Sequence, residues 1–370
     1  MRSTLLVDAL APQPGGIGRY TRELCKGLQG RDDVDVRFVA HGRLIEDPTA
    51  LLRSTRLPRL SRLRRWIDRR AVRGLLGSTL VHGPNYFLPD GVDGGVITVH
   101  DLSVFRFPET HPAERVRQFE KLFRSSLDRS SQIITDTETV RAEVIAAFGV
   151  PDDRVTAIPL GVDARFRPHS AEESRETLAS LGLEPGGYGL CVSTLEPRKK
   201  IAELLHAWEH LSAGLRDRFP LVLAGGSGWR NEGLRDLVDR GTGQGWLKHL
   251  GFVDEAEIPA LYAGARLFIY PSVYEGFGLP PLEAMASGVP VIVSNLSCLP
   301  EVCGPAATYI DPFDLEGFSN AIEEALGDQA RREKQVETGL ERAASFTWAR
   351  CVGGTVGVYR AAVAEGAGQG

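Results

Sequence analysis

Two carboxylates and two cations in the C-terminal half of the chain have the residue types and spacing to do chemistry. Glu275 and Glu283 flank a glycine-rich stretch, and Arg198 and Lys199 follow a short apolar run. Carboxylates accept hydrogen bonds from ligand hydroxyls, and two adjacent cations can clamp a diphosphate. Each of these residues taken alone also fits a simpler interpretation, as a helix-face or turn carboxylate or as a solvated basic turn.

The glycine-rich stretch lies between a predicted strand and a predicted helix. Residues 265–270 form a short apolar run typical of a buried strand. Gly276 and Gly278 follow, and two prolines then suit the first turn of a helix, which we expect to end at residues 287–288, before a strand over 289–293. A glycine loop at a helix N-terminus presents backbone N–H groups and a partial positive charge. The stretch is therefore suited to bind an anion.

A second strand, glycine turn and helix lie near the N-terminus. Residues 4–8 are predicted to form a strand, Gly15 and Gly16 the turn, and residues 20–28 an amphipathic helix. This geometry can admit a phosphate. Packing alone is the alternative, because a lone glycine-rich turn is weak evidence for a ligand.

Further polar side chains follow predicted strands of the N-terminal half. His100 and Asp101 come directly after an apolar run over residues 96–99. Doubly wound parallel sheets bind ligands at the carboxyl ends of their strands, so both residues are candidates for a site. A structural hydrogen bond is the alternative for a single histidine.

Length and composition limit the class of protein. A chain of 370 residues predicts two domains, and 42% hydrophobic residues are enough for substantial cores. A net charge of −5 argues against a nucleic-acid partner. No apolar run approaches the roughly 20 residues that span a bilayer. Five scattered cysteines fit a reducing cytosol and lack metal-ligand spacing. We therefore expect a cytoplasmic protein.

The segment Arg53–Arg73 is rich in arginine. Leu60, Leu63 and Ile67 fall on one helical face within it, so the segment can form a basic amphipathic helix. Such a helix can bind anionic lipid headgroups or a pyrophosphate-linked lipid acceptor, which would place the protein on the inner face of the plasma membrane. A solvated helix is the alternative.

The stretch Tyr270–Pro290 resembles, nearly residue for residue, the E-x7-E signature of the retaining glycosyltransferase family 4. Residues 98–101 resemble the family's H-D element, residues 155–163 the element that closes its first domain, and residues 193–200 its donor-diphosphate element. The resemblance covers essentially the whole chain and is strongest over 188–320.

The resemblance implies the α/β fold called GT-B, in which two Rossmann-like, doubly wound domains face each other across a cleft. We expect an acceptor-binding domain over residues 1–165 and a domain over residues 166–346 that binds the nucleotide-sugar donor. A C-terminal helix over residues 347–370 would cross back to the first domain.

The family also implies roles for individual residues. His100 would lie beside the transferred sugar with Asp101 orienting it, and Arg198 and Lys199 would hold the donor diphosphate. Glu275 would hold sugar hydroxyls. The implied catalytic residues are thus His100, Asp101, Arg198, Lys199 and Glu275. The implied donor-binding residues are Gly15, Gly16, Thr194, Gly226, Phe252, Val253, Gly276, Phe277, Gly278, Leu279 and, at the ribose diol, Glu283.

One position departs from the family pattern. Thr194 stands where many members have an arginine, five residues before the lysine that corresponds to Lys199. Arg198 is expected to supply the missing charge. Asp33 and Asp35 spell the D-x-D pattern that holds a divalent cation in the other major glycosyltransferase fold, but they lie in an acidic surface turn. We therefore expect no metal and no cofactor.

The motifs look most like those of bacterial mannosyl- and rhamnosyltransferases of surface-polysaccharide assembly. The expected reaction is metal-independent transfer of a hexose, mannose or a related sugar from a GDP-sugar such as GDP-mannose, with retention, onto a glycan or polyprenyl-diphosphate-linked saccharide. A UDP- or dTDP-sugar donor, and a GT-B sugar-nucleotide epimerase, are the alternatives. A glycoside hydrolase would need two carboxylates roughly 5–10 Å apart, and a nicotinamide enzyme a G-x-G-x-x-G string, and neither is apparent.

Overall fold

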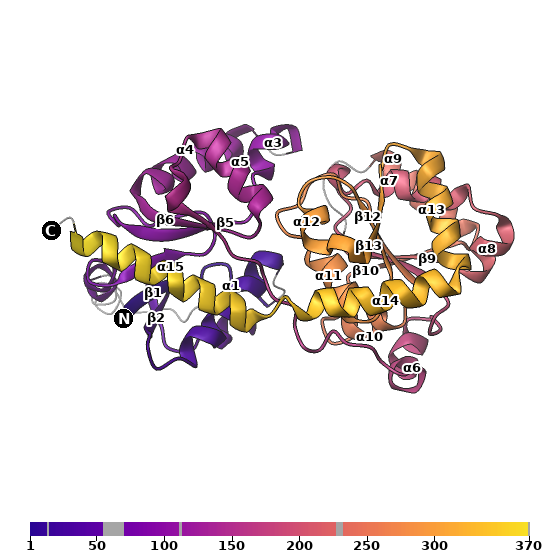
Figure 1. Ribbon diagram of the computed structural model, residues 1–370, viewed down its shortest axis with the longest axis horizontal. Helices are drawn as coiled ribbons and strands as arrows, with labels where there is room; N and C mark the ends of the chain where they lie inside the picture. The colour runs from indigo at the N-terminus through magenta and orange to yellow at the C-terminus, as the bar shows by residue number, and fades with distance from the viewer. Residues whose placement is uncertain (13–14, 55–69, 111–112, 227–231, 369–370) are drawn as a thin grey trace. The chain divides into compact units, whose positions relative to one another are not determined.

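The computed structural model describes residues 1–12, 15–54, 70–110, 113–226 and 232–368. The chain forms two compact units (Figure 1). Unit 1 comprises Met1–Gly161 together with Thr347–Gly370, and unit 2 comprises Val162–Phe346. The chain passes from unit 1 to unit 2 between Gly161 and Val162, and it returns to unit 1 between Phe346 and Thr347.

Unit 1 is built on a seven-stranded sheet with the order β3-β2-β1-β4-β5-β6-β7. Only β3 runs antiparallel to its neighbour, and the other neighbouring pairs are parallel. The strands are β1 (Arg2–Leu6), β2 (Asp35–Ala40), β3 (Arg43–Ile45), β4 (Leu80–Gly83), β5 (Gly95–Val99), β6 (Ser130–Thr135) and β7 (Val155–Ala157). Because the strand order reverses between β1 and β4, the carboxyl ends of these two strands form the switch point where such sheets bind ligands.

Helices cover both faces of this sheet (Figure 1). Helices α4 (Ala113–Arg129) and α5 (Glu138–Phe148) lie on one face, and α1 (Gly16–Gln29) and α15 (Trp348–Gly368) on the other. The short α3 (Ser103–Arg106) precedes α4. A Cβ atom on Gly27 of α1 would lie 2.5 Å from Val352 of α15, so glycine permits the close packing of these two helices.

Unit 2 contains a six-stranded, all-parallel sheet with the order β10-β9-β8-β11-β12-β13. Its strands are β8 (Gly189–Val192), β9 (Leu221–Ala224), β10 (Leu247–Gly251), β11 (Leu267–Tyr270), β12 (Val291–Ser294) and β13 (Ala307–Ile310). Strands β8, β9, β11 and β12 are short and almost wholly buried, as expected for the middle of a sheet covered on both faces, whereas the edge strands β10 and β13 are partly exposed. The switch point of this sheet lies between β8 and β11.

The helices of unit 2 also form two layers around the sheet. They are α6 (Ala171–Ser180), α7 (Ile201–Glu209), α8 (Ala213–Arg218), α9 (Glu232–Gly243), α10 (Ile258–Ala263), α11 (Leu279–Ala286), α12 (Leu299–Cys303), α13 (Leu315–Gly327) and α14 (Gln329–Ala344). Helices α7, α9 and α13 share one core cluster with the strands, and α10 and α11 lie on the opposite side of the sheet (Figure 1). The fully buried Trp208 of α7 anchors that core.

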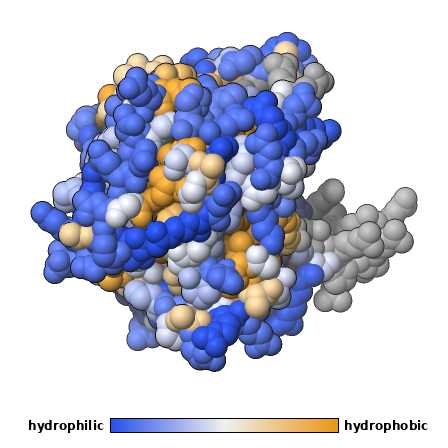
Figure 2. Space-filling model, turned by 90° about the vertical axis from the view of Figure 1, so that its right-hand side faces the viewer, coloured by the Kyte–Doolittle hydropathy of each residue, from blue (hydrophilic) through white to orange (hydrophobic). Residues whose placement is uncertain are grey.

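The surface of unit 2 that carries α8 and α13 is mostly hydrophilic, and its apolar residues gather in small separate patches (Figure 2). Five cysteines of the chain are free and buried. Within the described ranges of the chain, none of the helices combines the length and the apolar character needed to cross a bilayer.

Candidate functional site

The two cations that follow β8 contact the first carboxylate of the glycine loop that follows β11. Lys199 donates from Nζ to Glu275 Oε1 and, over 2.8 Å, to the Tyr270 hydroxyl. Arg198 Nη1 lies 3.3 Å from Glu275 Oε2. Strands β8 and β11 are neighbours, so residues far apart in the sequence meet at the switch point of the sheet.

This cluster is charged although it is buried. Lys199 is 6% exposed and Glu275 is 9% exposed. Burial by itself raises the pKa of Glu275, but the charges of Lys199 and Arg198, with hydrogen bonds from Lys199 and Ser272, outweigh burial and lower that pKa to about 2. Glu275 is therefore an ionised carboxylate at neutral pH. Each carboxylate oxygen can accept more than one hydrogen bond, so Glu275 keeps acceptor capacity for ligand hydroxyls.

Arg198 is held by further acceptors. Its Nη1 donates to the Tyr274 carbonyl over 2.7 Å, and its Nη2 lies 2.7 Å from Glu196 Oε1. Thr194, at the position where the family often has an arginine, is exposed, and its hydroxyl lies 3.4 Å from Glu196. The guanidinium of Arg198 thus has one fixed orientation at the carboxyl end of β8.

The glycine loop ends as the sequence predicts, at the N-terminus of a helix. Gly278 is the N-cap of α11 and has φ of 98°, a conformation that favours glycine. A Cβ atom there would also lie 2.9 Å from a methyl of Leu299. The ring of Phe277 is buried and packs edge-on against Phe346, with ring centroids 5.7 Å apart. Only the main chain of Phe277 is therefore available to a ligand.

The other donor-binding candidates of unit 2 lie at the same edge of the sheet. Gly226 follows β9, and its carbonyl accepts a hydrogen bond of 3.1 Å from the Leu195 amide. Phe252 and Val253 follow β10; the first is 63% exposed and the second is buried. Glu283 lies in α11 and is buried. Gly226, Phe252 and Val253 therefore lie at the carboxyl ends of β9 and β10, and Glu283 lies in the helix that begins at the glycine loop.

In unit 1, both ring nitrogens of the buried His100 have partners. Nδ1 lies 2.7 Å from Asp136 Oδ2, and Nε2 lies 2.8 Å from the Pro84 carbonyl oxygen. The ring of Tyr20 packs edge-on against the imidazole at a centroid distance of 5.0 Å. A carbonyl oxygen can only accept, so Nε2 carries a hydrogen.

The expected role of Asp101 in orienting His100 is wrong. Asp101 Oδ1 accepts a hydrogen bond of 2.8 Å from the Ser103 amide at the start of α3, and Asp136 holds the histidine instead. Asp136 follows β6, the strand beside β5, so the sheet brings it to His100. Adjacent residues on an extended chain point in different directions, which explains why Asp101 does not reach the ring.

The protonation of His100 follows from these partners. Burial by itself would lower its pKa, but the charge and hydrogen bond of Asp136 and the Pro84 carbonyl outweigh burial and raise the pKa of His100. The next residue after Asp136, Thr137, caps α5 by accepting from the Val140 amide over 3.2 Å. The strand end at 133–138 thus supplies both a cap for α5 and the partner of His100.

The first glycine turn lies between β1 and α1. Gly15 is the N-cap of α1 and has an ordinary φ of −69°. A Cβ atom there would meet no described atom within 4 Å, so neither the backbone nor local packing requires glycine at this position. Gly16 is the first residue of α1. The turn follows β1 at the switch point of the unit 1 sheet.

Both aspartates of the D-x-D pattern form ion pairs with arginines. Asp33 accepts from Arg31 over 2.7 and 2.8 Å and pairs with Arg360 of α15, and Asp35 pairs with Arg37. Over the residues that the structure describes, no group of three or more His, Cys, Asp or Glu side chains could hold a metal ion. Most of the basic segment 53–73 lies outside the described residues.

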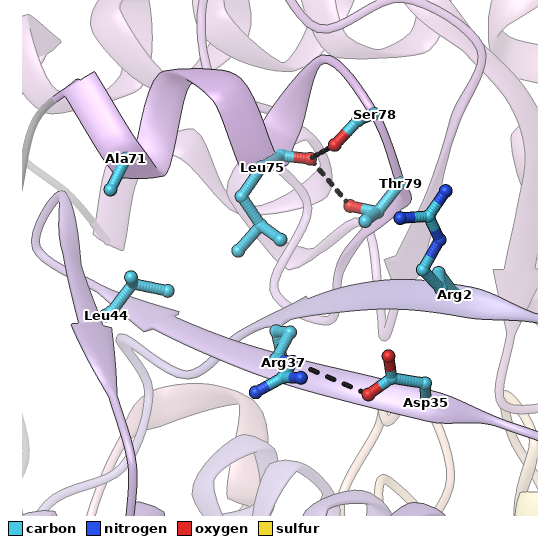
Figure 3. A pocket seen from close by; sticks show the side chains of 8 residues that line it. All are labelled: Arg2, Asp35, Arg37, Leu44, Ala71, Leu75, Ser78 and Thr79. Atoms are coloured by element: carbon cyan, nitrogen blue, oxygen red, sulfur yellow. Dashed lines mark hydrogen bonds and ion pairs between the residues drawn. The ribbon is translucent and has the colours of Figure 1, made fainter.

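Unit 1 also has a pocket of about 420 Å³ (Figure 3). Its lining is Arg2, Asp35, Arg37, Leu44, Ala71, Leu75, Ser78 and Thr79. Arg2 and Asp35 begin β1 and β2, so the pocket lies at the amino ends of the strands, away from the carboxyl edge. The hydroxyls of Ser78 and Thr79 both donate to the Leu75 carbonyl rather than into the pocket. The pocket is therefore separate from the candidate site.

Comparison with solved structures gives the fold of the chain. The structure titled sucrose-phosphate synthase from Thermosynechococcus elongatus is 20% identical, with a TM-score of 0.77, and the match covers 99% of this chain and 100% of that one. The glycosyltransferase WaaG, described as involved in lipopolysaccharide biosynthesis, is 18% identical with a TM-score of 0.71, over 96% and 98% of the two chains. The two Rossmann-like units thus form the GT-B fold of glycosyltransferases.

Sequence comparison gives the family. The model for "Glycosyltransferase Family 4" matches residues 14–166, and the model for "Glycosyl transferases group 1" matches residues 177–342. The O-antigen chain mannosyltransferase B of Escherichia coli is 39% identical over 93% of this chain and 96% of that protein. The chain belongs to glycosyltransferase family 4, as the resemblance of its E-x7-E stretch predicts, and is a hexosyltransferase of the nucleotide-sugar-dependent class.

Proposed function

We propose that this enzyme transfers mannose from GDP-mannose, with retention, onto a glycan or polyprenyl-diphosphate-linked saccharide. The name of the 39% identical relative, an O-antigen chain mannosyltransferase, supports mannose and a surface polysaccharide. The observation that carries the chemistry is the buried contact of Lys199 and Arg198 with Glu275 beside the glycine loop.

Stabilisation of the leaving diphosphate is the proposed source of catalysis. As the bond from the sugar to the phosphate breaks, negative charge develops on the diphosphate. Arg198, Lys199, the amides of residues 276–279 and the positive end of α11 are preorganised to receive that charge. An ammonium has three N–H groups, and Lys199 uses two on Glu275 and Tyr270, so we assign the third to a phosphate oxygen. Because these groups neutralise the diphosphate, the proposed reaction needs no metal.

The remaining groups bind the rest of the donor. Glu275 accepts hydroxyls of the transferred sugar, and Glu283 accepts the ribose diol. The main chain at Phe252 and Val253 contacts the base. In unit 1, Gly15 and Gly16 allow a ligand to lie against the backbone, since no local packing requires glycine at Gly15.

His100 acts on the sugar through its Nε2–H in this proposal. That N–H is donated to the Pro84 carbonyl in the structure, and a sugar oxygen would take the place of the carbonyl as acceptor. Asp136 keeps the proton on the ring. His100 is therefore a hydrogen-bond donor to the sugar rather than a general base.

Retention follows if the acceptor attacks from the face that the diphosphate leaves. The acceptor oxygen forms a bond to the anomeric carbon, the bond from that carbon to the phosphate oxygen breaks, and the acceptor proton passes to the departing diphosphate. A polyprenyl-linked acceptor would lie at the cytoplasmic face of a membrane, where the basic segment Arg53–Arg73 would bind anionic lipid.

A panel of nucleotide sugars tests the proposal. A ligand that binds only the folded state raises the melting temperature. With a chelator present, GDP-mannose should raise the Tm most, and Lys199→Gln should remove most of that rise. The exposed Lys334→Gln of α14 is the matched control and should leave the rise unchanged. A larger rise with a UDP- or dTDP-sugar would replace the donor assignment, and loss of binding with the chelator would overturn the metal-independent mechanism.

A further inference from the structure

A second loop holds the glycine loop from the side opposite Arg198. It follows β12 and contains Ser297 and Cys298. The Ser297 hydroxyl accepts from the Glu275 amide over 3.1 Å and donates to the Glu275 carbonyl over 2.8 Å. The buried Cys298 thiol donates to the carbonyls of Glu275 and Phe277, each at 3.2 Å.

These contacts fix the direction of the loop amides. In a planar trans peptide the C=O and N–H bonds point in opposite directions. The Glu275 carbonyl points to Ser297 and Cys298, so the Gly276 N–H points away from them. The Phe277 carbonyl points to Cys298, so the Gly278 N–H also points away. Both amides therefore face the opposite side of the loop.

Arg198 lies on that opposite side of the glycine loop. The Glu275 N–H points to Ser297, so the Tyr274 carbonyl on the same peptide points away, and it accepts from Arg198 Nη1 over 2.7 Å. The N–H groups of Gly276 and Gly278 thus point to the side where Arg198 lies. Alternation of the peptide planes places two N–H donors and a guanidinium on one side.

We infer that Ser297 and Cys298 are positioning residues for the donor diphosphate, because they turn the amides of Gly276 and Gly278 toward the phosphate oxygens. The inference rests on the proposed function and deepens it. Neither side chain touches the ligand, and each acts through the main chain of the glycine loop.

The backbone of Ser297 supports this role. Its φ is 57°, in the left-handed region that residues other than glycine rarely adopt. The strained backbone places the hydroxyl where it contacts both the amide and the carbonyl of Glu275. Glycine would adopt this conformation without strain, but it would lack the hydroxyl.

Isothermal titration of the full chain with GDP and with UDP tests the inference, using the nucleotide that the wild type binds more tightly. Ser297→Gly keeps the backbone accessible and removes both hydroxyl contacts. It should weaken binding roughly tenfold. Ser319→Ala is the matched control, because the buried Ser319 hydroxyl also donates to main-chain carbonyls, of Ala207 and Leu315, in a different part of unit 2. It should bind as the wild type does.

Cys298 gives an independent arm of the test. Cys298→Ala should weaken binding, and Cys298→Ser, which keeps a donor, should restore most of it. Wild-type affinity in both Ser297→Gly and Cys298→Ala would overturn the positioning role while leaving the proposed function intact. Failure of the wild type to bind either nucleotide would overturn both. If Cys298→Ala does not fold, Ser297→Gly decides the outcome.

Discussion

Replacing Glu275 by glutamine separates the structural and chemical roles of the buried ion cluster. The variant keeps the shape of the side chain and removes the charge that faces Lys199 and Arg198. Lys199 is 6% exposed, so its ammonium would stay buried without a counter-charge. Breaking a buried pair in this way costs about 3–5 kcal/mol. At about 2–4 °C per kcal/mol for a unit of this size, the unfolding transition of unit 2 should fall by roughly 6–20 °C.

Although Glu275→Gln should lower the Tm of the unliganded protein, it should increase the stabilisation that GDP gives. A nucleoside diphosphate supplies the negative charge that Glu275→Gln lacks, so GDP should raise the Tm of the variant more than that of the wild type. GDP-mannose should lose its advantage over GDP, because the carboxylate that accepts the sugar hydroxyls is absent.

Glu196→Gln is the matched control, since it removes the other carboxylate on Arg198, where solvent has access. It should cost about 1 kcal/mol or less. Scanning calorimetry with and without ligand measures both effects. If the Tm of Glu275→Gln is no lower than that of Glu196→Gln, the buried contact of Glu275 with Lys199 and Arg198 does not stabilise unit 2.

Three further predictions concern the titrating groups and the second carboxylate. Asp136→Asn removes the charge that raises the pKa of His100. In the wild type the imidazole therefore stays protonated until the pH exceeds this raised pKa, and in the variant it should lose its proton at a lower pH. The alkaline limb of the kcat profile should therefore move to lower pH, and an unmoved limb would count against the pairing. The carboxylate of Glu275 stabilises the fold above its ordinary pKa of 4.5 and loses that effect as pH falls toward 2. The stability gap between the wild type and Glu275→Gln in urea unfolding should therefore narrow over that range, and a constant gap would contradict the lowered pKa. Glu283→Ala should raise the KM for donor about tenfold with a smaller change in kcat, whereas His100→Ala should mainly lower kcat; steady-state kinetics would refute the assigned roles if the pattern were reversed.

The elements around the glycine loop could be predicted from the sequence because their signals are local. The apolar run before Pro271 became β11, and the proline-rich start and Ser287-Gly288 end bound α11. These boundaries depend on backbone chemistry within a few residues, which the sequence displays directly.

The hydrogen-bond partners of the site residues could not be predicted, because the order of strands in the sheet determines which residues meet. Asp136 reaches His100 from the neighbouring strand β6, and Ser297 and Cys298 reach the glycine loop from β12. No local pattern marks these residues. Strand order would have identified them, since polar residues at the carboxyl ends of adjacent parallel strands meet at one edge.

The assignment of residues 164–186 to a unit also depends on packing that the local sequence does not show. Residues 164–186 have the polar, proline-containing character of a hinge, yet they contain α6 and belong to unit 2. The contact of Leu178 with unit 2 neighbours such as Gly264 depends on packing that the local composition does not reveal.

A crystal structure of the wild-type chain with bound GDP would show where the diphosphate binds. We expect the diphosphate within hydrogen-bond distance of the amides of residues 276–279, with Arg198 and Lys199 on its oxygens and no metal ion between them. A diphosphate bound at another edge of unit 2, or one held through a metal, would refute the proposed stabilisation of the leaving group.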